Sequence, residues 1–179
     1  GYYNNREAST ERVRNGWYWT GDLGYRDEAG FFYFGGRSAD WLRVDSENFA
    51  AGPVENIVSR FHGVVMAAVY PVPDPTTGDM VMVAIEMNEM TEFSPHKFDE
   101  FLSQQRDLGT KWSPQIVRVI EAMPLTANNK VHKPPLRASK WFAADTHYWR
   151  PERSQPLRLM NESDKQELEA RFAANGRTQ

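Results

Sequence analysis

Residues 16–37 read GWYWTGDLGYRDEAGFFYFGGR. Two aromatic runs flank an Asp-Glu-Ala-Gly turn, a pattern that predicts a two-stranded antiparallel ribbon. Such a ribbon brings Asp22 and Arg37 to the same neighbourhood. A carboxylate acceptor beside a five-donor guanidinium suits a ligand with vicinal hydroxyls, such as a ribose, with a phosphate nearby. A plain surface ion pair is the simpler interpretation, and both stay open at this point.

An aromatic ribbon of two strands is marginal in water unless something covers its apolar face. No segment of this chain is an obvious cover. The chain also begins on Gly1 with the residues GYYNN and no initiator Met, so we expect it to be cut from a longer protein that supplies the cover.

The composition is that of a globular protein, and it excludes several kinds of site. Of the 179 residues, 40% are hydrophobic and 13% aromatic, which is enough apolar material for a core. A net charge of −3 with scattered Lys and Arg argues against a nucleic-acid partner. Cysteine is absent, which excludes disulfides, zinc-thiolate sites and thiol nucleophiles. The four histidines lie far apart without metal-ligand spacing, so no metal site is predicted.

The sequence shows no apolar run long enough to cross a bilayer and no amino-terminal signal. We therefore expect a cytoplasmic protein, with peripheral membrane association as the alternative.

Residues 42–142 alternate between helical and extended patterns, which predicts an α+β fold. Apolar residues recur at helical spacing over 54–61, β-branched strands follow over 64–69 and 80–87, Ser94 caps a second helix, and 116–120 read as a third strand. We expect a three-stranded sheet with two helices on one face, and a two-stranded hairpin whose tip is residues 45–48. Residues 71–79 are expected to be a turn-rich connection, and 136–142 a short helical piece.

Residues 143–179 are expected to form a tail that is loop-like to residue 160 and ends in a helix. Ser163 is the expected cap of that helix, with Gln166 in capping-box spacing and Gly176 as its terminator. Because the helix is mostly charged, we expect it to dock lightly or to lie on the surface.

A second candidate site is the loop of residues 124–133, PLTANNKVHK. A lysine at the end of a short polar loop can reach an oxyanion and place a compact positive charge beside it. An exposed lysine is also common in any protein, so Lys130 by itself predicts little. The sequence offers no Gly-rich phosphate loop, no convincing Ser-His-Asp order and no paired carboxylates in an apolar setting.

Three pieces in one order resemble the carboxy-terminal portion of the adenylate-forming enzymes, the acyl-CoA synthetases and their relatives. They are residues 16–24, residues 36–55 (GRSADWLRVDSENFAAGPVE) and residues 125–130 (LTANNK). The resemblance runs from residue 1 to about 140. The segment 130–133, the following Leu136 and Arg137, and a long tail with Tyr148 and Pro151 are most similar to the long- and very-long-chain fatty-acyl-CoA synthetases.

The resemblance implies four parts: the end of a large amino-terminal domain (residues 1–36), a hinge (37–41), a mobile carboxy-terminal domain (42–142) and the tail (143–179). It implies an acid–thiol ligase that joins a fatty acid to AMP from ATP with Mg²⁺, and then passes the acyl group to CoA. The partners would be the protein's own large domain, the fatty acid, ATP and CoA. No tightly bound cofactor is expected, and this fragment alone is expected to be inactive.

The same resemblance assigns roles to single residues. Asp22 matches the residue that holds the ribose hydroxyls, Arg37 the one near ribose and phosphate, and Lys130 the catalytic lysine of adenylation. Ala39 and Asp40 would be the hinge, about which the small domain swings between two half-reactions. The CoA channel would be lined by Arg43, Ser46, Glu47 and Asn48.

Three positions depart from the family pattern. Ala39 stands where the pivot is usually Asp or Lys, Ser46 replaces a Gly of the second-step loop, and Asn129 replaces a Gly before the lysine. Asparagine tolerates positive φ better than most residues. The alternatives are a fragment of a carrier-protein-loading enzyme, of a bioluminescent or amino-acid-activating relative, or a non-catalytic nucleotide-binding relative.

Overall fold

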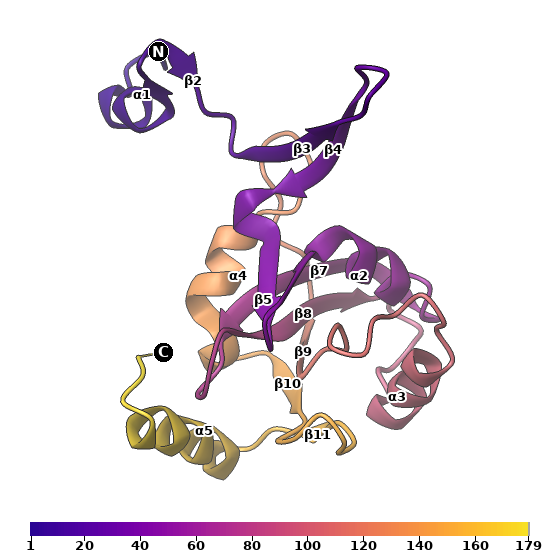
Figure 1. The fold of residues 1–179 in the computed structure, drawn as a ribbon. Coiled ribbons are helices and arrows are strands. Elements are labelled where there is room, and N and C mark those ends of the chain that lie inside the picture. Colours follow the sequence, from indigo (N-terminus) through magenta and orange to yellow (C-terminus); the bar gives the residue numbers. More distant parts are fainter. Residues whose placement is uncertain (179) are drawn as a thin grey trace. The chain divides into compact units, whose positions relative to one another are not determined.

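The structure is a computed structural model that describes residues 1–178 (Figure 1). It divides into two compact units, Gly1–Ala39 and a larger unit from Asp40 onward, here called units 1 and 2. Unit 1 contains α1 (Arg6–Arg12), β1 (Val13–Arg14), β2 (Trp17–Tyr18), β3 (Asp22–Arg26) and β4 (Phe32–Arg37).

A 3₁₀ turn, Ser38–Asp40, spans the boundary. Unit 2 contains, in chain order, β5 (Trp41–Val44), β6 (Glu47–Ala50), α2 (Ala51–Val58), β7 (Val64–Pro73), β8 (Asp79–Met87), α3 (Pro95–Ser103), β9 (Ile116–Ile120), α4 (Lys133–Ser139), a 3₁₀ turn (Lys140–Phe142), β10 (Thr146–Trp149), β11 (Arg158–Leu159) and α5 (Glu162–Ala174).

The predicted ribbon is present in unit 1, but it is shorter than the aromatic pattern. β3 pairs antiparallel with β4, whereas the first aromatic run, in β2, pairs with β1 instead. Gly16 and Gly21 have φ values of 79° and 81°, a left-handed conformation that turns the chain on either side of β2. The first aromatic run therefore leaves the line of the ribbon.

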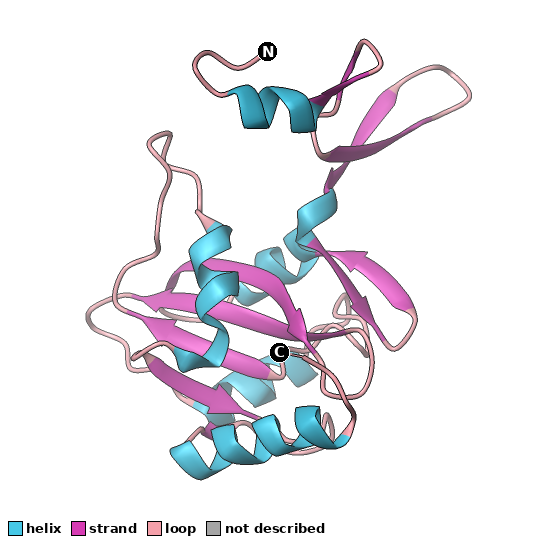
Figure 2. Ribbon diagram, turned by 90° about the vertical axis from the view of Figure 1, so that its left-hand side faces the viewer, coloured by secondary structure: helices cyan, strands magenta, loops and turns pink. Residues whose placement is uncertain are grey.

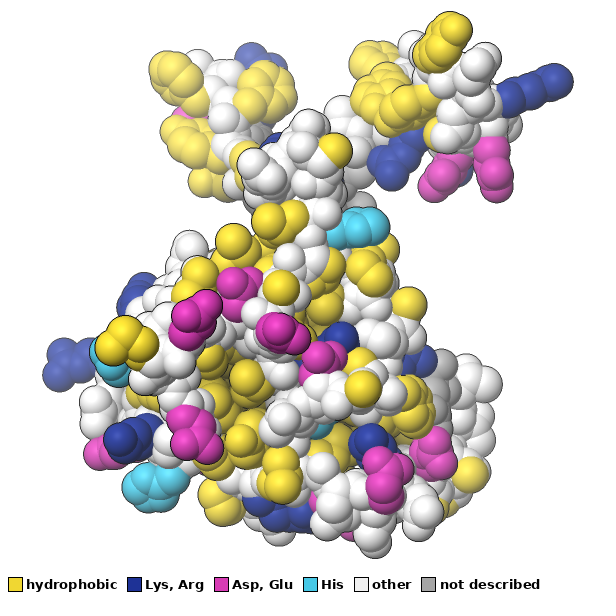
Figure 3. Space-filling model, turned by 180° about the vertical axis from the view of Figure 1, so that it is seen from behind, with side chains coloured by type: hydrophobic (Ala, Val, Ile, Leu, Met, Phe, Trp, Pro, Cys, Tyr) yellow, Lys and Arg dark blue, Asp and Glu magenta, His cyan; other side chains and the backbone are white. Residues whose placement is uncertain are grey.

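Unit 1 exposes its apolar side chains. Over residues 1–39, all of them described, no side chain is buried. The exposed large apolar residues include Trp17, Trp19, Phe31, Phe32 and Phe34. Figure 3 shows hydrophobic side chains gathered on the surface of this unit. Unit 1 thus presents the apolar face that the sequence left without a cover.

Unit 2 is built on one mixed sheet with strand order β11-β10-β9-β8-β7. β8 and β9 run parallel, with α3 in the crossover between them, and the other neighbours pair antiparallel. The α+β class is confirmed. The expected strand count of three is wrong, because the tail adds β10 and β11 beside β9.

Both faces of this sheet are covered. Alternating residues of β8 divide between two cores: Val81, Val83 and Ile85 pack with α2 and α3, and Met80, Met82 and Ala84 pack with α4 and α5. Figure 2 shows the second pair of helices on the side of the sheet that faces the viewer. The prediction of two helices on one face is therefore correct for α2 and α3, and incomplete for the other face.

Two predicted loops are strands. β7 continues through Pro71 and Pro73, where a turn-rich connection was expected. β7 lies at the edge of the sheet, and an edge strand tolerates proline because it has a neighbouring strand on one side only. Part of the loop-like tail forms β10 and β11, since Trp149 and His147 alternate toward the core. Of the helices formed by the described residues, none has the length and apolarity needed to cross a membrane.

The terminal helix begins earlier and packs more firmly than predicted. Its cap is Asn161, whose side chain accepts from the Asp164 N–H at 3.0 Å, while Asp164 accepts from the Asn161 N–H at 2.9 Å. Arg158 also makes a bidentate hydrogen bond to Asp164, which favours a helix start at this position. Leu168 and Phe172 are buried, so α5 is part of the core.

Candidate functional site

Asp22 and Arg37 face each other across the β3–β4 ribbon as paired residues. Arg37 Nε lies 3.5 Å from Asp22 Oδ1, and the side chains are 65% and 41% exposed. An exposed ion pair at this distance is weak. Both charges therefore remain available to a ligand.

Local hydrogen bonds fix the backbone on either side of this pair. The Asp22 N–H donates to Thr20 Oγ1 at 3.0 Å, and Ser38 Oγ donates to the Gly21 carbonyl at 3.1 Å. A Cβ on Gly24 would lie 2.8 Å from the Tyr33 carbonyl oxygen, at a bulge where the strands approach closely. The ribbon thus needs glycine here to bring Asp22 and Arg37 into register.

Lys130 lies at the end of a closed polar loop. The Lys130 carbonyl accepts from the Thr126 N–H at 2.7 Å, and the Lys130 N–H donates to Thr126 Oγ1 at 3.2 Å. Asn129 has a φ of 56°, the left-handed conformation that a glycine would otherwise supply. The Lys130 side chain is exposed, so its position is set by the loop backbone while its ammonium stays in solvent.

The predicted CoA-channel residues lie on the β5–β6 hairpin. Arg43 pairs with Asn48 across the two strands, and both are exposed, as is Ser46 in the turn. The turn itself is Asp45–Ser46, shorter than the expected tip of 45–48, because Glu47 already belongs to β6. In Figure 1, β5 runs down to this turn, whereas the loop before α4 that carries Lys130 lies above that helix. The structure therefore keeps Lys130 apart from the hairpin turn.

The hairpin is anchored at its base and along one side. Asp79 Oδ2 accepts from the Arg43 N–H at 2.8 Å, and burial raises the pKa of this aspartate. Trp112 Nε1 donates to Glu47 Oε1 at 2.8 Å, and the Trp112 ring stacks on Phe49 with centroids 5.1 Å apart. Glu47 is thus engaged inside the domain rather than free to meet a ligand.

The predicted hinge residues lie on either side of the division between the units, Ala39 in unit 1 and Asp40 in unit 2. Asp40 accepts a hydrogen bond from Arg137, and its Oδ2 lies 3.6 Å from Lys133 Nζ. Lys133 Nζ lies 2.7 Å from Glu55 Oε1 as well. The first residue of unit 2 therefore forms ion pairs with two residues of α4, the helix that follows the Lys130 loop.

Sequence reasoning missed the residues that hold these parts in place. In the sequence, Glu55 and Lys133 stand out only as members of motifs, and Lys111 and Arg153 belong to none. Arg137 lies 97 positions from Asp40 in sequence. No local pattern in a sequence signals a pairing at that separation. Among the described residues, no cluster of three or more His, Cys, Asp or Glu could hold a metal ion.

Comparisons with known proteins are consistent with this geometry. Residues 53–130 match the model of the AMP-binding enzyme C-terminal domain. The chain is 48% identical over 178 residues to steroid-22-oyl-CoA synthetase of Rhodococcus jostii, an alignment that covers 99% of this chain and 32% of that protein. It is 47% identical to medium/long-chain-fatty-acid–CoA ligase FadD17 of Mycobacterium tuberculosis, over 81% of this chain and 29% of that one.

Solved structures agree. ATP-bound MatB of Rhodopseudomonas palustris has a TM-score of 0.64 and 26% identity, covering 78% of this chain and 27% of that chain. The chain spans about a third of the length of the curated relatives it matches. The chain belongs to the adenylate-forming, acyl-CoA synthetase superfamily, and it carries the C-terminal domain of these enzymes.

Proposed function

We propose that this chain is the carboxy-terminal part of an ATP-dependent fatty-acyl-CoA ligase. The observation that carries the proposal is the 48% identity to a CoA synthetase, in an alignment over 99% of the chain that spans the whole candidate site. The relatives are named for steroid and fatty-acid substrates, so the acid proposed here is an apolar carboxylic acid of that kind.

In the first half-reaction the carboxylate attacks the α-phosphorus of ATP, the acyl-adenylate forms, and pyrophosphate leaves. We assign Asp22 to the ribose hydroxyls, because an ionised carboxylate is an acceptor with room for two donors. Arg37, opposite it on the ribbon, would donate to ribose and phosphate oxygens. Mg²⁺ would enter as the complex with ATP, and would balance the phosphate charge there.

Lys130 would stabilise the negative charge that develops as the phosphate is attacked. Its ammonium is exposed on a loop of fixed backbone, which suits a group that must be delivered to a substrate. In the second half-reaction the CoA thiol attacks the acyl carbon and AMP leaves. The exposed residues Arg43, Ser46 and Asn48 of the β5–β6 hairpin would then line the thiol's approach, with Glu47 supporting them from inside.

Two half-reactions with different residues require the small domain to change its position, and we place the pivot at Ala39 and Asp40. The residues 1–36 would belong to the large amino-terminal domain, whose remaining parts would cover the exposed aromatic face. Residues 42–142 would form the mobile domain, and the tail that begins at residue 143 is joined to it through β10, β11 and α5.

The test separates the two half-reactions in the protein with its large domain in place. Lys130→Ala is expected to slow pyrophosphate release with ATP and a long-chain fatty acid by about 10²–10³-fold, because this is the usual effect of removing one group that donates a hydrogen bond to the transition state. Thioester formation from supplied acyl-adenylate and CoA should change far less. The matched control is Lys97→Ala, which removes an exposed lysine on α3.

Equal loss in both half-reactions would refute the role of Lys130. A product loaded on a carrier protein rather than on CoA would refute the acceptor. The 179-residue chain alone should release no pyrophosphate, since the proposal places the acyl pocket and phosphate loop in the large domain.

A further inference from the structure

The turn of the β5–β6 hairpin has a backbone conformation that its residues do not favour. Asp45 has a φ of 46° and Ser46 a φ of 68°. A two-residue hairpin turn with both φ values positive is normally built from Asn-Gly or Asp-Gly, because glycine adopts this conformation without strain. Ser46 gives the turn no such freedom. The turn therefore depends on support from elsewhere in unit 2.

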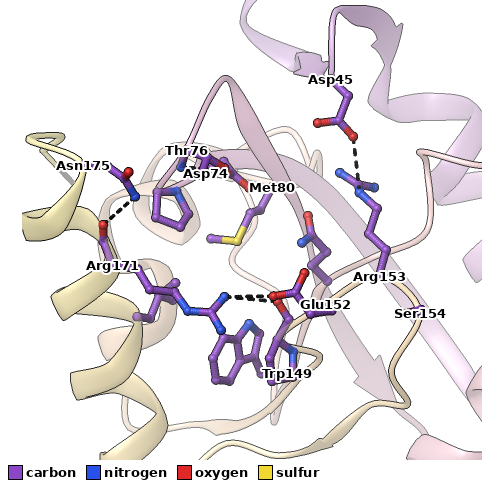
Figure 4. A pocket seen from close by; sticks show the side chains of 14 residues that line it. Asp45, Asp74, Thr76, Met80, Trp149, Glu152, Arg153, Ser154, Arg171 and Asn175 are labelled. Carbon is purple, nitrogen blue, oxygen red and sulfur yellow. Dashed lines mark hydrogen bonds and ion pairs between the residues drawn. The ribbon is translucent and has the colours of Figure 1, made fainter.

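Two basic residues that are distant in sequence supply that support. Lys111 Nζ donates to the Asp45 carbonyl at 2.8 Å, and Arg153 Nε lies 3.5 Å from Asp45 Oδ2. Arg153 Nη1 also donates to the Lys111 carbonyl at 3.0 Å. The three residues close a triangle, so each contact limits the movement of the other two. Figure 4 shows the Arg153 side chain directed at Asp45 on the rim of a cavity of about 550 Å³.

Arg153 belongs to the tail, and the tail presents it from a fixed base. Arg150, three residues earlier, is buried, and its Nε donates to the Pro114 carbonyl at 3.0 Å. Its Nη2 also pairs with Asp99 at 2.5 Å. Residues 150–153 are therefore held next to the segment before β9, the segment that carries Lys111. Arg153 lies outside residues 53–130, the part that matches the family's C-terminal domain model.

We propose that Arg153 is a positioning residue, which acts with Lys111 to hold the strained Asp45–Ser46 turn in place for the second half-reaction. The assignment to that step rests on the proposed function, whereas the bracing of the turn does not. The tail thus supports the hairpin turn through the Arg153 side chain, which would not contact the substrate.

The first experiment measures amide hydrogen exchange of residues 44–48 in the chain, by NMR. Arg153→Ala is expected to speed exchange at the turn at least tenfold while the midpoint of thermal unfolding shifts by only a few degrees. Arg153→Lys should restore part of the protection, because one ammonium cannot reach both Asp45 and the Lys111 carbonyl. The control, Arg60→Ala, removes a surface pair with Asp107 and should leave the turn unchanged.

Ser46→Gly provides the decisive comparison. If Arg153 holds a strained turn, glycine removes the need for it, so Arg153→Ala should speed exchange much less in the Ser46→Gly background than in the parent. Exchange within twofold of the parent in Arg153→Ala, or an equal effect in both backgrounds, would overturn the bracing role.

The second experiment uses the protein with its large domain and follows the two half-reactions. Arg153→Ala should lower kcat for thioester formation from acyl-adenylate at least fivefold, with adenylation changed less than twofold. A loosened turn with an unchanged thioester step would overturn the assignment to that step. A loosened turn in a protein that makes no acyl-CoA at all would refute the proposed function and leave the bracing intact.

Discussion

Aromatic side chains lie in water in unit 1 and in a core in unit 2. Trp17 and Phe32 are 75% and 81% exposed, whereas Trp141 and Trp149 are at most 1% exposed. Both units have antiparallel strands with aromatic residues on them. The difference is that unit 2 places helices on both faces of its sheet, while unit 1 has a single two-turn helix and two short hairpins. An apolar strand face therefore indicates that another element must pack on it. Whether that element is present depends on the rest of the chain.

The largest expected effect tests this difference directly. Trp141→Ala should lower the free energy of unfolding by about 3–5 kcal/mol, because it empties a fully enclosed position beside Phe172. Trp17→Ala removes the same side chain from an exposed place and should change it by no more than about 0.5 kcal/mol. Denaturation of both variants in urea provides the measurement. Similar losses would mean that unit 1 shares the core of the cooperative fold.

A smaller effect is expected at the first residue of unit 2. Asp40→Asn should cost about 1–3 kcal/mol, because it removes the carboxylate partner of the half-buried Arg137 and one of the two carboxylates beside Lys133, which keeps Glu55. The Lys133 side chain is only 13% exposed and that of Arg137 24%, so water relieves little of this loss. Asp107→Asn is the control, since it breaks a half-exposed pair with Arg60 and should cost less. Equal losses in urea denaturation would show that the Asp40 network adds nothing beyond a surface pair.

The sequence predicted the parts of the fold that local patterns encode. Helical spacing gave α2, the Ser94–Pro95 pair gave the start of α3, and β-branched runs gave β8 and β9. It failed where tertiary position decided. Pro71 and Pro73 predict a turn-rich connection, although a strand at a sheet edge tolerates both prolines. The tail looked like loop because β10 and β11 are short and owe their order to pairing with β9.

The candidate site divides in the same way. The pairing of Asp22 with Arg37 followed from the ribbon alone, since strands of this length bring their ends into register. The contacts that support the site did not follow from the ribbon. Lys111, Arg137 and Arg153 contact residues that lie 66, 97 and 108 (153 − 45) positions away in the sequence. Contacts at such separations leave no periodic trace in a single sequence.

The smallest expected effect depends on pH and belongs to unit 2, because residues 1–39 contain no histidine. His147, on β10, is 3% exposed, and its Nδ1 lies 2.7 Å from the Asp145 carbonyl. Burial lowers the pKa of this imidazole, with a further contribution from the nearby charge of Arg118. Folding therefore holds His147 neutral at a pH where the unfolded chain would already protonate it.

The sign of the pH dependence follows from this. Below the unfolded-state pKa of about 6.5, the unfolded chain binds a proton that the folded chain does not, so stability falls as the pH falls, by up to about 1.4 kcal/mol per pH unit. The fall ends below the lower folded-state pKa. Urea denaturation between pH 7.5 and about 5 should show this slope in the parent and a shallower one in His147→Gln, whatever that variant loses at neutral pH. His62→Gln, at an exposed position, should keep the parent slope, and an unchanged slope in His147→Gln would place the acid sensitivity elsewhere in the unit.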